Sequence, residues 1–289
     1  ITGITLPITK HNYLIKKTED LPRIIKEAFH IARSGRPGPV LVDIPKDVFT
    51  AKIDFKYPDK VEIPSYNPRY EGHPKQIALA SKAIQAAKQP VIYAGGGVIS
   101  SGAAKELKEL AEKCNIPVTT TLMGKGAFPE THELSLGMLG MHGTAYANYA
   151  VTDCDLLIAV GARFDDRVTG HIAKFAPNAK IIHLDVDPAE IGKNVRVDIP
   201  IVGDVKRVLR ALLDKIGPKE KHVQWIEQID DWKKKFPLSY KSAGGLKPQY
   251  IIEQINELTK DRETIIATEV GQNQMWAAMF YKFTRPRTL

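Results

Sequence analysis

Three consecutive glycines, Gly95-Gly96-Gly97, follow a short apolar run in the middle third of the chain. Glycine tolerates positive φ angles and lets backbone N–H groups approach a phosphate, and a helix that starts just beyond adds a favourable dipole. The pattern therefore predicts a phosphate-binding turn. It is not the complete G-x-G-x-x-G fingerprint, because Ser100 stands at the last glycine position and no acidic residue ends the next predicted strand. Ordinary NAD binding is disfavoured, and a tight turn without a ligand remains the alternative.

Further ligand-type residues follow the later apolar runs. Thr121 and Leu122 come after the second run, and residues 136–144 form a loop rich in glycine and methionine that includes His142. Methionine packs adaptably against flat aromatic systems. A single histidine is as often structural as functional, so both roles stay open for His142.

Residues 161–170 hold two arginines and two aspartates between glycines. Guanidinium groups bind phosphates and carboxylates bidentately, so Arg163 and Arg167 predict an anion-binding loop. A metal site at the two aspartates is disfavoured, because the arginines compete for the carboxylates. Asp185 and Asp204 end later strands. A carboxylate there can accept a hydrogen bond from a ribose hydroxyl or an adenine amino group, and Asp204 also suits a helix cap.

These groups converge only if the apolar runs form parallel strands. Strands are predicted over 91–94, 116–122, 156–160, 181–184 and 199–202, and helices over 74–87, 100–114, 143–151 and 205–216. This alternation predicts an α/β fold, a Rossmann-like parallel sheet flanked by helices, which binds ligands beyond the carboxyl ends of its strands. Because each group above follows a strand, we predict an adenine dinucleotide site, with an empty domain as the alternative.

Partial α/β patterns flank this domain. A helix capped by Asp20 and a strand over 39–45, buried on both faces, indicate the end of one unit, and a helix over 248–258 and a strand over 264–268 indicate the start of another. The charged stretch with Trp225, Trp232 and residues 233–235 predicts a helix that leads away from the domain, with its aromatic side chains packed against neighbours. We expect these parts: 1–50, a linker over 51–73, the middle domain over 74–217, a connector over 218–246, and 247–289.

The composition excludes several classes of protein. The 289 residues, 43% hydrophobic and 26% charged, fit a folded globular protein rather than a disordered or membrane protein. The net charge of +8 raises the question of nucleic acid, but the excess lies in the two flanking regions and no RNA-binding signature accompanies it. We expect neither a nucleic-acid nor a membrane partner. Two cysteines, Cys114 and Cys154, without a C-x-x-C motif predict a reduced, cytoplasmic protein without structural zinc.

Five segments resemble the catalytic subunit of the acetolactate synthase (acetohydroxyacid synthase) family of thiamine-diphosphate enzymes. They are residues 34–47, 139–144, 161–170, 189–194 and 269–278. The resemblance covers essentially the whole chain. It implies the C-terminal end of a pyrimidine-binding domain, a complete FAD-binding middle domain and the start of a diphosphate-binding domain, so we expect the chain to be an internal fragment.

The resemblance also implies an activity. Enzymes of this family condense two pyruvates, or pyruvate and 2-oxobutyrate, with loss of CO2, to give 2-acetolactate or 2-aceto-2-hydroxybutyrate on the route to valine and isoleucine. They hold FAD, thiamine diphosphate and Mg²⁺, and the FAD takes no net redox part. A homodimer or homotetramer is implied, and a regulatory small subunit is a further partner that the resemblance allows.

Contacts are implied residue by residue. Arg167 is expected near the carboxylate of the second substrate, and Gln272 and Asn273 against thiamine diphosphate, with Asn273 standing where many relatives have histidine. Contacts with FAD are implied for Arg36, Gly96, Thr121, Leu122, Leu139, Gly140, Met141, His142, Gly161, Ala162, Arg163, Phe164, Asp165, Asp185, Val186, Asp204 and Val205.

Two functional parts of the family are expected outside this sequence, namely the catalytic glutamate and the Gly-Asp-Gly metal motif. No metal ligand is therefore predicted here, and we expect the chain alone to be inactive and to bind FAD more weakly than its parent. The alternatives are another thiamine-diphosphate enzyme, such as a pyruvate oxidase or a glyoxylate carboligase, and a non-catalytic dinucleotide-binding module.

Overall fold

A computed structural model describes residues 1–217, 222–241 and 243–289. The chain divides into two compact units, Ile1–Arg69 and Tyr70–Leu289. Residues 51–69, at the end of the first unit, form neither helix nor strand. In the described ranges, no helix is long and apolar enough to cross a membrane.

The first unit contains a two-stranded parallel sheet, in which β1 (His11–Leu14) pairs with β2 (Val40–Asp43). The helix α2 (Leu21–Arg33) connects the two strands and buries Ile24 and Ala28, as its helical spacing predicts, and also Ile31. The short helices of this unit are α1 (Thr2–Thr5), η1 (Leu6–Ile8), η2 (Thr18–Asp20) and α3 (Lys46–Thr50).

Two predictions for this unit were wrong. Asp20 stands before α2, but its carboxylate makes no capping bond and instead pairs with Arg23, 3.0 Å away. The residues of β2 are half-buried rather than buried on both faces, because a sheet of two strands with one long helix beside it offers them too little cover within this unit.

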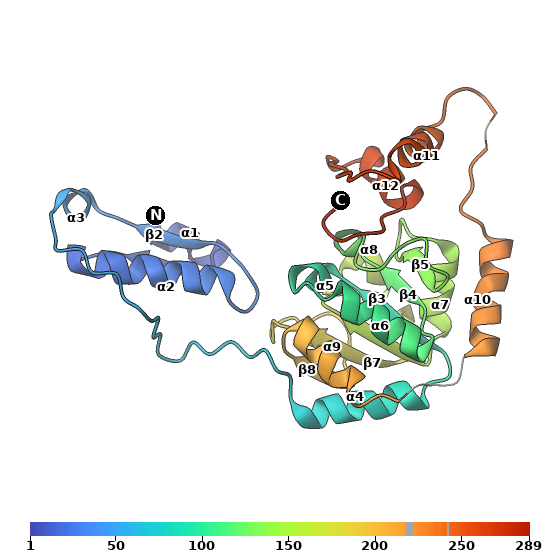
Figure 1. The fold of residues 1–289 in the computed structure, drawn as a ribbon, viewed down its shortest axis with the longest axis horizontal. Coiled ribbons are helices and arrows are strands. Elements are labelled where there is room, and N and C mark those ends of the chain that lie inside the picture. The colour runs from blue at the N-terminus through green and yellow to red at the C-terminus, as the bar shows by residue number, and fades with distance from the viewer. Residues whose placement is uncertain (218–221, 242) are drawn as a thin grey trace. The chain divides into compact units, whose positions relative to one another are not determined.

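The second unit is built on a six-stranded, wholly parallel sheet with the order β5-β4-β3-β6-β7-β8 (Figure 1). Its strands are β3 (Pro90–Ala94), β4 (Val118–Thr120), β5 (Ser135–Met138), β6 (Leu156–Val160), β7 (Lys180–Asp185) and β8 (Ile199–Val202). In chain order this is the 3-2-1-4-5-6 arrangement of Rossmann folds. The predicted fold class is confirmed, and β5 is an additional strand that the glycine at position 137 concealed in the sequence.

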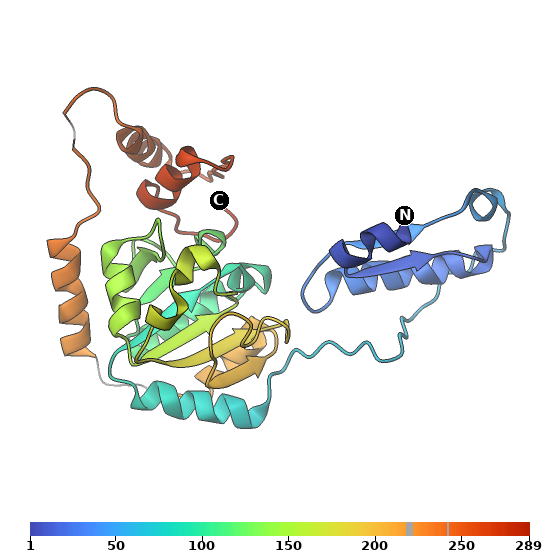
Figure 2. The same cartoon turned by 180° about the vertical axis from the view of Figure 1, so that it is seen from behind.

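Helices cover both faces of this sheet (Figures 1 and 2). Successive residues of β3 alternate between the two cores: Ile92 and Ala94 pack beneath α4, α6 and α9, whereas Val91 and Tyr93 pack beneath α7 and α10. The helices of the unit are α4 (Pro74–Ala86), α5 (Gly96–Ser100), α6 (Ala104–Cys114), η3 (Leu122–Gly124), α7 (Ala145–Asp153), α8 (Asp166–Thr169), η4 (Ile172–Lys174), α9 (Val205–Leu213), α10 (Val223–Lys235), α11 (Pro248–Thr259) and α12 (Gln272–Phe280).

The helix predicted from Ser100 to Cys114 is two helices, α5 and α6. Gly102 lies between them with a φ of +66°, a backbone conformation that ends the first helix. The change brings the start of α5 back to Gly96, directly after the strand.

The helix α10 packs against α7 within the second unit and does not lead away from the domain. Trp225 and Ile229 are almost completely buried in the core beside α7, and the indole N–H of Trp225 donates to the Pro90 carbonyl at 3.1 Å. The prediction that its aromatic side chains pack against neighbours is confirmed. Its terminal lysines make local contacts, such as Lys234 with Asp231 at 3.8 Å.

The strand predicted over 264–268 is absent from the structure. Ile266 donates one backbone hydrogen bond to Thr288, at 2.8 Å, and Ile265 is exposed. No strand of the described ranges pairs with this apolar run, while α11 and α12 pack against each other.

Candidate functional site

The order of the sheet reverses between β3 and β6, and the two turns that follow these strands touch backbone to backbone. The Gly97 N–H donates to the Gly161 carbonyl at 3.0 Å. A Cβ atom at Gly97 would lie 2.6 Å from the Gly161 Cα, and one at Gly95 would lie 2.2 Å from the Gly161 oxygen. Close chain packing therefore requires these glycines. The helix α5 that follows has five residues, so its dipole contributes little.

The loop after β5 is fastened to the loop after β6. The Met141 N–H donates to the Arg167 carbonyl at 2.9 Å. Gly140 has a φ of +100°, and a Cβ there would lie 2.7 Å from the Arg167 oxygen. From α7, the Asn148 side chain accepts from the Gly140 N–H at 3.0 Å and donates to the Gly140 carbonyl at 3.1 Å. Asn148 was not predicted from the sequence, where it is one polar residue in a helix.

Some of the charged side chains in the loop after β6 pair with each other. The Asp165 carboxylate pairs with Arg163 and accepts from the Arg167 N–H at 3.2 Å, which caps α8. A hydrogen bond shared with Asp166, the bond from the Arg167 N–H and the charge of Arg163 hold the pKa of Asp165 below its usual range. The Arg167 side chain is exposed, and no carboxylate in the described ranges pairs with it. Of the two predicted anion-binding arginines, Arg163 is paired within the loop, whereas Arg167 has no carboxylate partner among the described residues.

Phe164 and His183 hold this loop in place through buried contacts. Phe164 has a φ of +53° and is buried, with its ring 5.0 Å from that of His183. The His183 Nε2 lies 2.8 Å from the Ala162 carbonyl, and burial lowers the pKa of His183 to about 4. At neutral pH the ring is therefore uncharged and donates this bond through Nε2–H. Asn194 adds bonds from its amide to the carbonyls of Arg163 and Phe164, at 3.2 and 3.1 Å.

His183 and Asn194 were missed by sequence reasoning. His183 stands inside an apolar strand and Asn194 in a long loop, and neither has a spacing that connects it with residues 161–165. The signal that could have been used is the histidine at a buried strand position, since a buried polar side chain needs a hydrogen-bond partner.

The remaining strand ends also carry their predicted residues to the same edge. Thr121 and Leu122 follow β4, with the Thr121 hydroxyl accepting from the Gly124 N–H at 2.9 Å. Asp185 is the last residue of β7 and Val186 follows it, and both are partly exposed. Asp204 accepts from the Arg207 N–H at 3.1 Å, so the cap predicted for α9 is confirmed.

Three predicted site residues lie elsewhere. Arg36 belongs to the first unit, just beyond α2. Gln272 and Asn273 begin α12, where both are exposed, and the Asn273 side-chain oxygen accepts from the Gln274 N–H at 2.6 Å. Among the residues that the structure describes, no group of three or more His, Cys, Asp or Glu side chains could hold a metal ion.

The residues along this edge fit a flavin dinucleotide. Met123 and Met141 are 74% and 65% exposed at this edge, so their flexible side chains are available for contact with a flat ring. The hydroxyl of Thr120, buried at the end of β4, has no hydrogen-bond partner in the described part of the chain. Partly exposed carboxylates at Asp185 and Asp204 can accept from hydroxyl and amino groups. These are groups that hold a ligand rather than groups that break its bonds.

The sequence of this chain is similar to those of known proteins. Residues 77–212 match the central domain of thiamine pyrophosphate enzymes. The chain is 56% identical to the probable acetolactate synthase large subunit of Methanocaldococcus jannaschii, over 99% of this chain and 50% of that protein. It is 50% identical to the acetolactate synthase of Mycobacterium bovis, over 100% of this chain and 48% of that protein. With the acetolactate synthase isozyme 3 large subunit of Escherichia coli K12 it shares 46% identity, over 99% of this chain and 51% of that protein.

The chain spans about half the length of the curated relatives it matches. The family match falls on the six-stranded sheet and its helices, and the similarity to large subunits extends on both sides of it. Residues 77–212 therefore match the central domain of thiamine pyrophosphate enzymes, and the chain is similar along its whole length to acetolactate synthase large subunits.

Proposed function

We propose that this chain is the flavin-binding part of an acetolactate synthase large subunit. Its middle domain, taken as residues 74–217, binds FAD along the carboxyl edge of the sheet. The observation that carries the proposal is the contact of Gly95 and Gly97 with Gly161, because it joins the two turns at the point where a Rossmann-like sheet binds dinucleotides.

Different residues are proposed to contact different parts of FAD, according to the groups they offer. Residues 139–142 offer backbone groups and the Met141 side chain to the flavin half. Asp185 and Asp204 accept hydrogen bonds from the ribose and adenine half. Ala162 and Val205 are buried, so they contribute backbone atoms only. Arg36, the one contact implied for the first unit, stays a prediction.

The whole enzyme is proposed to condense two pyruvates, or pyruvate and 2-oxobutyrate, with loss of CO2. Thiamine diphosphate, bound with Mg²⁺, supplies the electron sink for the decarboxylation. Arg167 has an exposed guanidinium without a carboxylate partner in the described ranges, which suits it to bind the carboxylate of the second 2-oxo acid. Gln272 and Asn273 offer amide donors and acceptors to thiamine diphosphate.

The proposed partners and location follow from the same similarity. Relatives named large subunits indicate a regulatory small subunit beside a homodimer or homotetramer, and we propose a cytoplasmic enzyme of valine and isoleucine biosynthesis. The flanking parts, residues 1–50 and 247–289, are proposed to belong to the pyrimidine-binding and diphosphate-binding domains. Residues 51–73 and 218–246 are proposed as the connections, and the second of them includes α10, which packs against α7 of the middle domain.

A titration of the chain with FAD, followed by flavin fluorescence, tests the binding proposal. We expect one FAD per chain and binding of riboflavin at least tenfold weaker, because riboflavin lacks the phosphate and adenosine parts. Equal affinity for the two ligands, or no FAD binding, would refute the proposal.

The activity is tested on the full-length enzyme by product analysis with pyruvate. Acetolactate is expected, and acetyl phosphate or acetate would indicate a pyruvate oxidase instead.

A further inference from the structure

The loop between β4 and β5 holds a buried ion pair outside the site described above. The Lys125 and Glu130 side chains are 2% and 6% exposed, and the Lys125 Nζ contacts Glu130 Oε1. Charged side chains are rarely buried to this degree unless they are paired. A pair of this kind is not by itself evidence of stabilisation, since two apolar side chains often serve as well. Its role is therefore sought in what the pair contacts.

The second oxygen of Glu130 reaches the segment that follows α12. The Phe283 N–H donates to Glu130 Oε2 at 2.9 Å, and the Glu130 N–H donates to the Phe283 carbonyl at 3.1 Å. Phe283 is almost fully buried. Arg285, two residues after Phe283, makes the second contact. Gly126 has a φ of +78°, and a Cβ there would lie 2.0 Å from the Arg285 oxygen. The loop and this segment thus touch at two places through their backbones.

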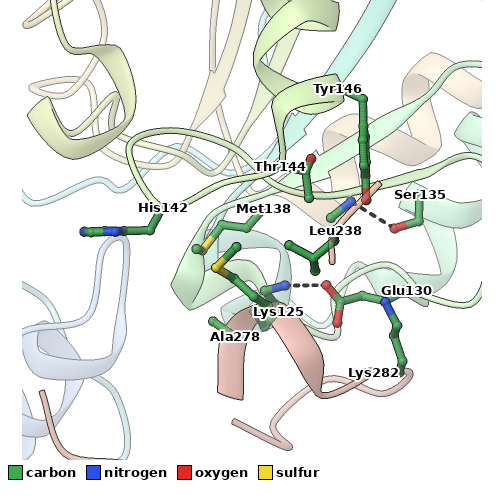
Figure 3. Close-up of a pocket in the computed structure, with 12 residues that line it drawn as sticks. Lys125, Glu130, Ser135, Met138, His142, Thr144, Tyr146, Leu238, Ala278 and Lys282 are labelled. Atoms are coloured by element: carbon green, nitrogen blue, oxygen red, sulfur yellow. Dashed lines mark hydrogen bonds and ion pairs between the residues drawn. The ribbon is translucent and has the colours of Figure 1, made fainter. Parts of the chain in front are cut away.

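The same loop starts at the proposed flavin contacts Thr121 and Leu122. A small cavity of about 40 Å³ joins the two regions, with Met138 and His142 on the side of the sheet and Ala278 of α12 on the other. Figure 3 shows the Lys125–Glu130 pair beside Ala278 and Met138. The cavity has room for no more than a few water molecules, and α12 contacts β5 directly.

We propose that the Lys125–Glu130 pair is a clamp that fixes the position of α12 relative to the flavin edge of the sheet. Lys125 orients the carboxylate of Glu130, and the carboxylate holds the Phe283 N–H. One loop then carries flavin contacts at its start and the anchor of α12 at its end. Glu130 and Lys125 are positioning residues, and the consequence for catalysis rests on the proposed function, in which Gln272 and Asn273 at the start of α12 contact thiamine diphosphate.

The test is a double variant of the chain, Lys125→Met with Glu130→Leu, analysed by amide hydrogen exchange. The variant leaves no buried charge, so the core should stay folded, but the Phe283 N–H loses its acceptor. We expect exchange of the amides around Phe283 to accelerate at least tenfold, while those of Ile92 and Ile158 in β3 and β6 keep their protection. The matched control, Asp231→Leu with Lys234→Met, removes an exposed ion pair on α10 and should leave both regions unchanged.

In the exchange experiment, two results would overturn the clamp. One is unchanged exchange at Phe283, and the other is equal acceleration there and in the core, which would mean general destabilisation. FAD titration of the same samples separates this proposal from the proposed function. A wild-type chain that binds no FAD refutes the function and leaves the exchange result to decide on the clamp. A double variant with an intact core but FAD affinity reduced more than tenfold would place the effect at the flavin end and refute the assignment to α12.

Discussion

Individual residues along the carboxyl edge differ in which atoms they offer to a ligand. Ala162 and Phe164 are buried, so their side chains belong to the core and only their backbone is available. Met141 and His142 are exposed, so their side chains are available as well. Substitutions of the first kind act through the fold, and those of the second kind act on binding directly.

His183 makes the stability of the chain depend on pH. Its pKa in the folded state is about 4, below the ordinary 6.5, because burial disfavours the charged ring. Between these values the unfolded chain binds more protons, so the stabilisation is complete above pH 6.5 and is lost as the pH falls toward 4. Linkage gives a loss of about 2 kcal/mol between pH 7.5 and 5. The free energy of unfolding, measured in urea at pH 7.5 and at pH 5, should show this loss in the wild type and not in His183→Asn. His171 is exposed, so the control His171→Asn should show the same loss as the wild type.

Gly97→Ala tests the contact between the two turns. An added Cβ would lie 2.6 Å from the Gly161 Cα, so either turn must move, at a cost of about 1–3 kcal/mol in the free energy of unfolding. FAD affinity should fall together with stability. Gly3→Ala is the matched control, because no atom lies within 4 Å of the added Cβ. A Gly97→Ala chain with wild-type stability and FAD affinity would contradict this account of the site.

At the scale of elements, loops position the site and neighbouring helices hold the loops. Asn148 of α7 makes two hydrogen bonds with Gly140, so Asn148→Ala should free the loop over 139–142 without disturbing the core. We expect FAD affinity to fall about tenfold, equivalent to about 1.4 kcal/mol, with unfolding almost unchanged. Thr152→Ala, one turn further along the same helix, is the control for fluorescence titration and should bind FAD like wild type.

The sequence predicts elements of this fold better than it predicts contacts between them. β6 was predicted over 156–160 and is found there, because a short run of five apolar residues is typical of a strand buried on both faces of a parallel sheet. β5 was missed, since Gly137 and its positive φ interrupt the apolar run. The run over 264–268 has strand composition but no neighbouring strand in this structure. Composition shows what a segment can do, and pairing depends on segments far away in the chain.

The candidate site shows the same limit. Strand ends could be located from the sequence, so Thr121, Asp185 and Asp204 were placed correctly at one edge. The supporting residues Asn148 and Asn194 could not be found, because their bonds join loops whose proximity arises only in the folded sheet. The pairing of Arg163 with Asp165 likewise depends on the turn that Phe164 makes at positive φ.

At the scale of the whole molecule, the two units predict how the chain responds to limited proteolysis. Residues 51–69 form neither helix nor strand, and an exposed backbone without such bonds is the preferred substrate of proteases. Cleavage there should release residues 70–289 as a folded piece. All six strand ends of the proposed site lie in this piece, so FAD should remain with it during gel filtration. Its affinity should fall by about tenfold to a hundredfold, the value of one lost charge-assisted contact at Arg36. Mass spectrometry locates the cut, and the uncut chain is the control. If FAD elutes free while residues 70–289 keep their circular dichroism spectrum, the first unit supplies more of the site than Arg36.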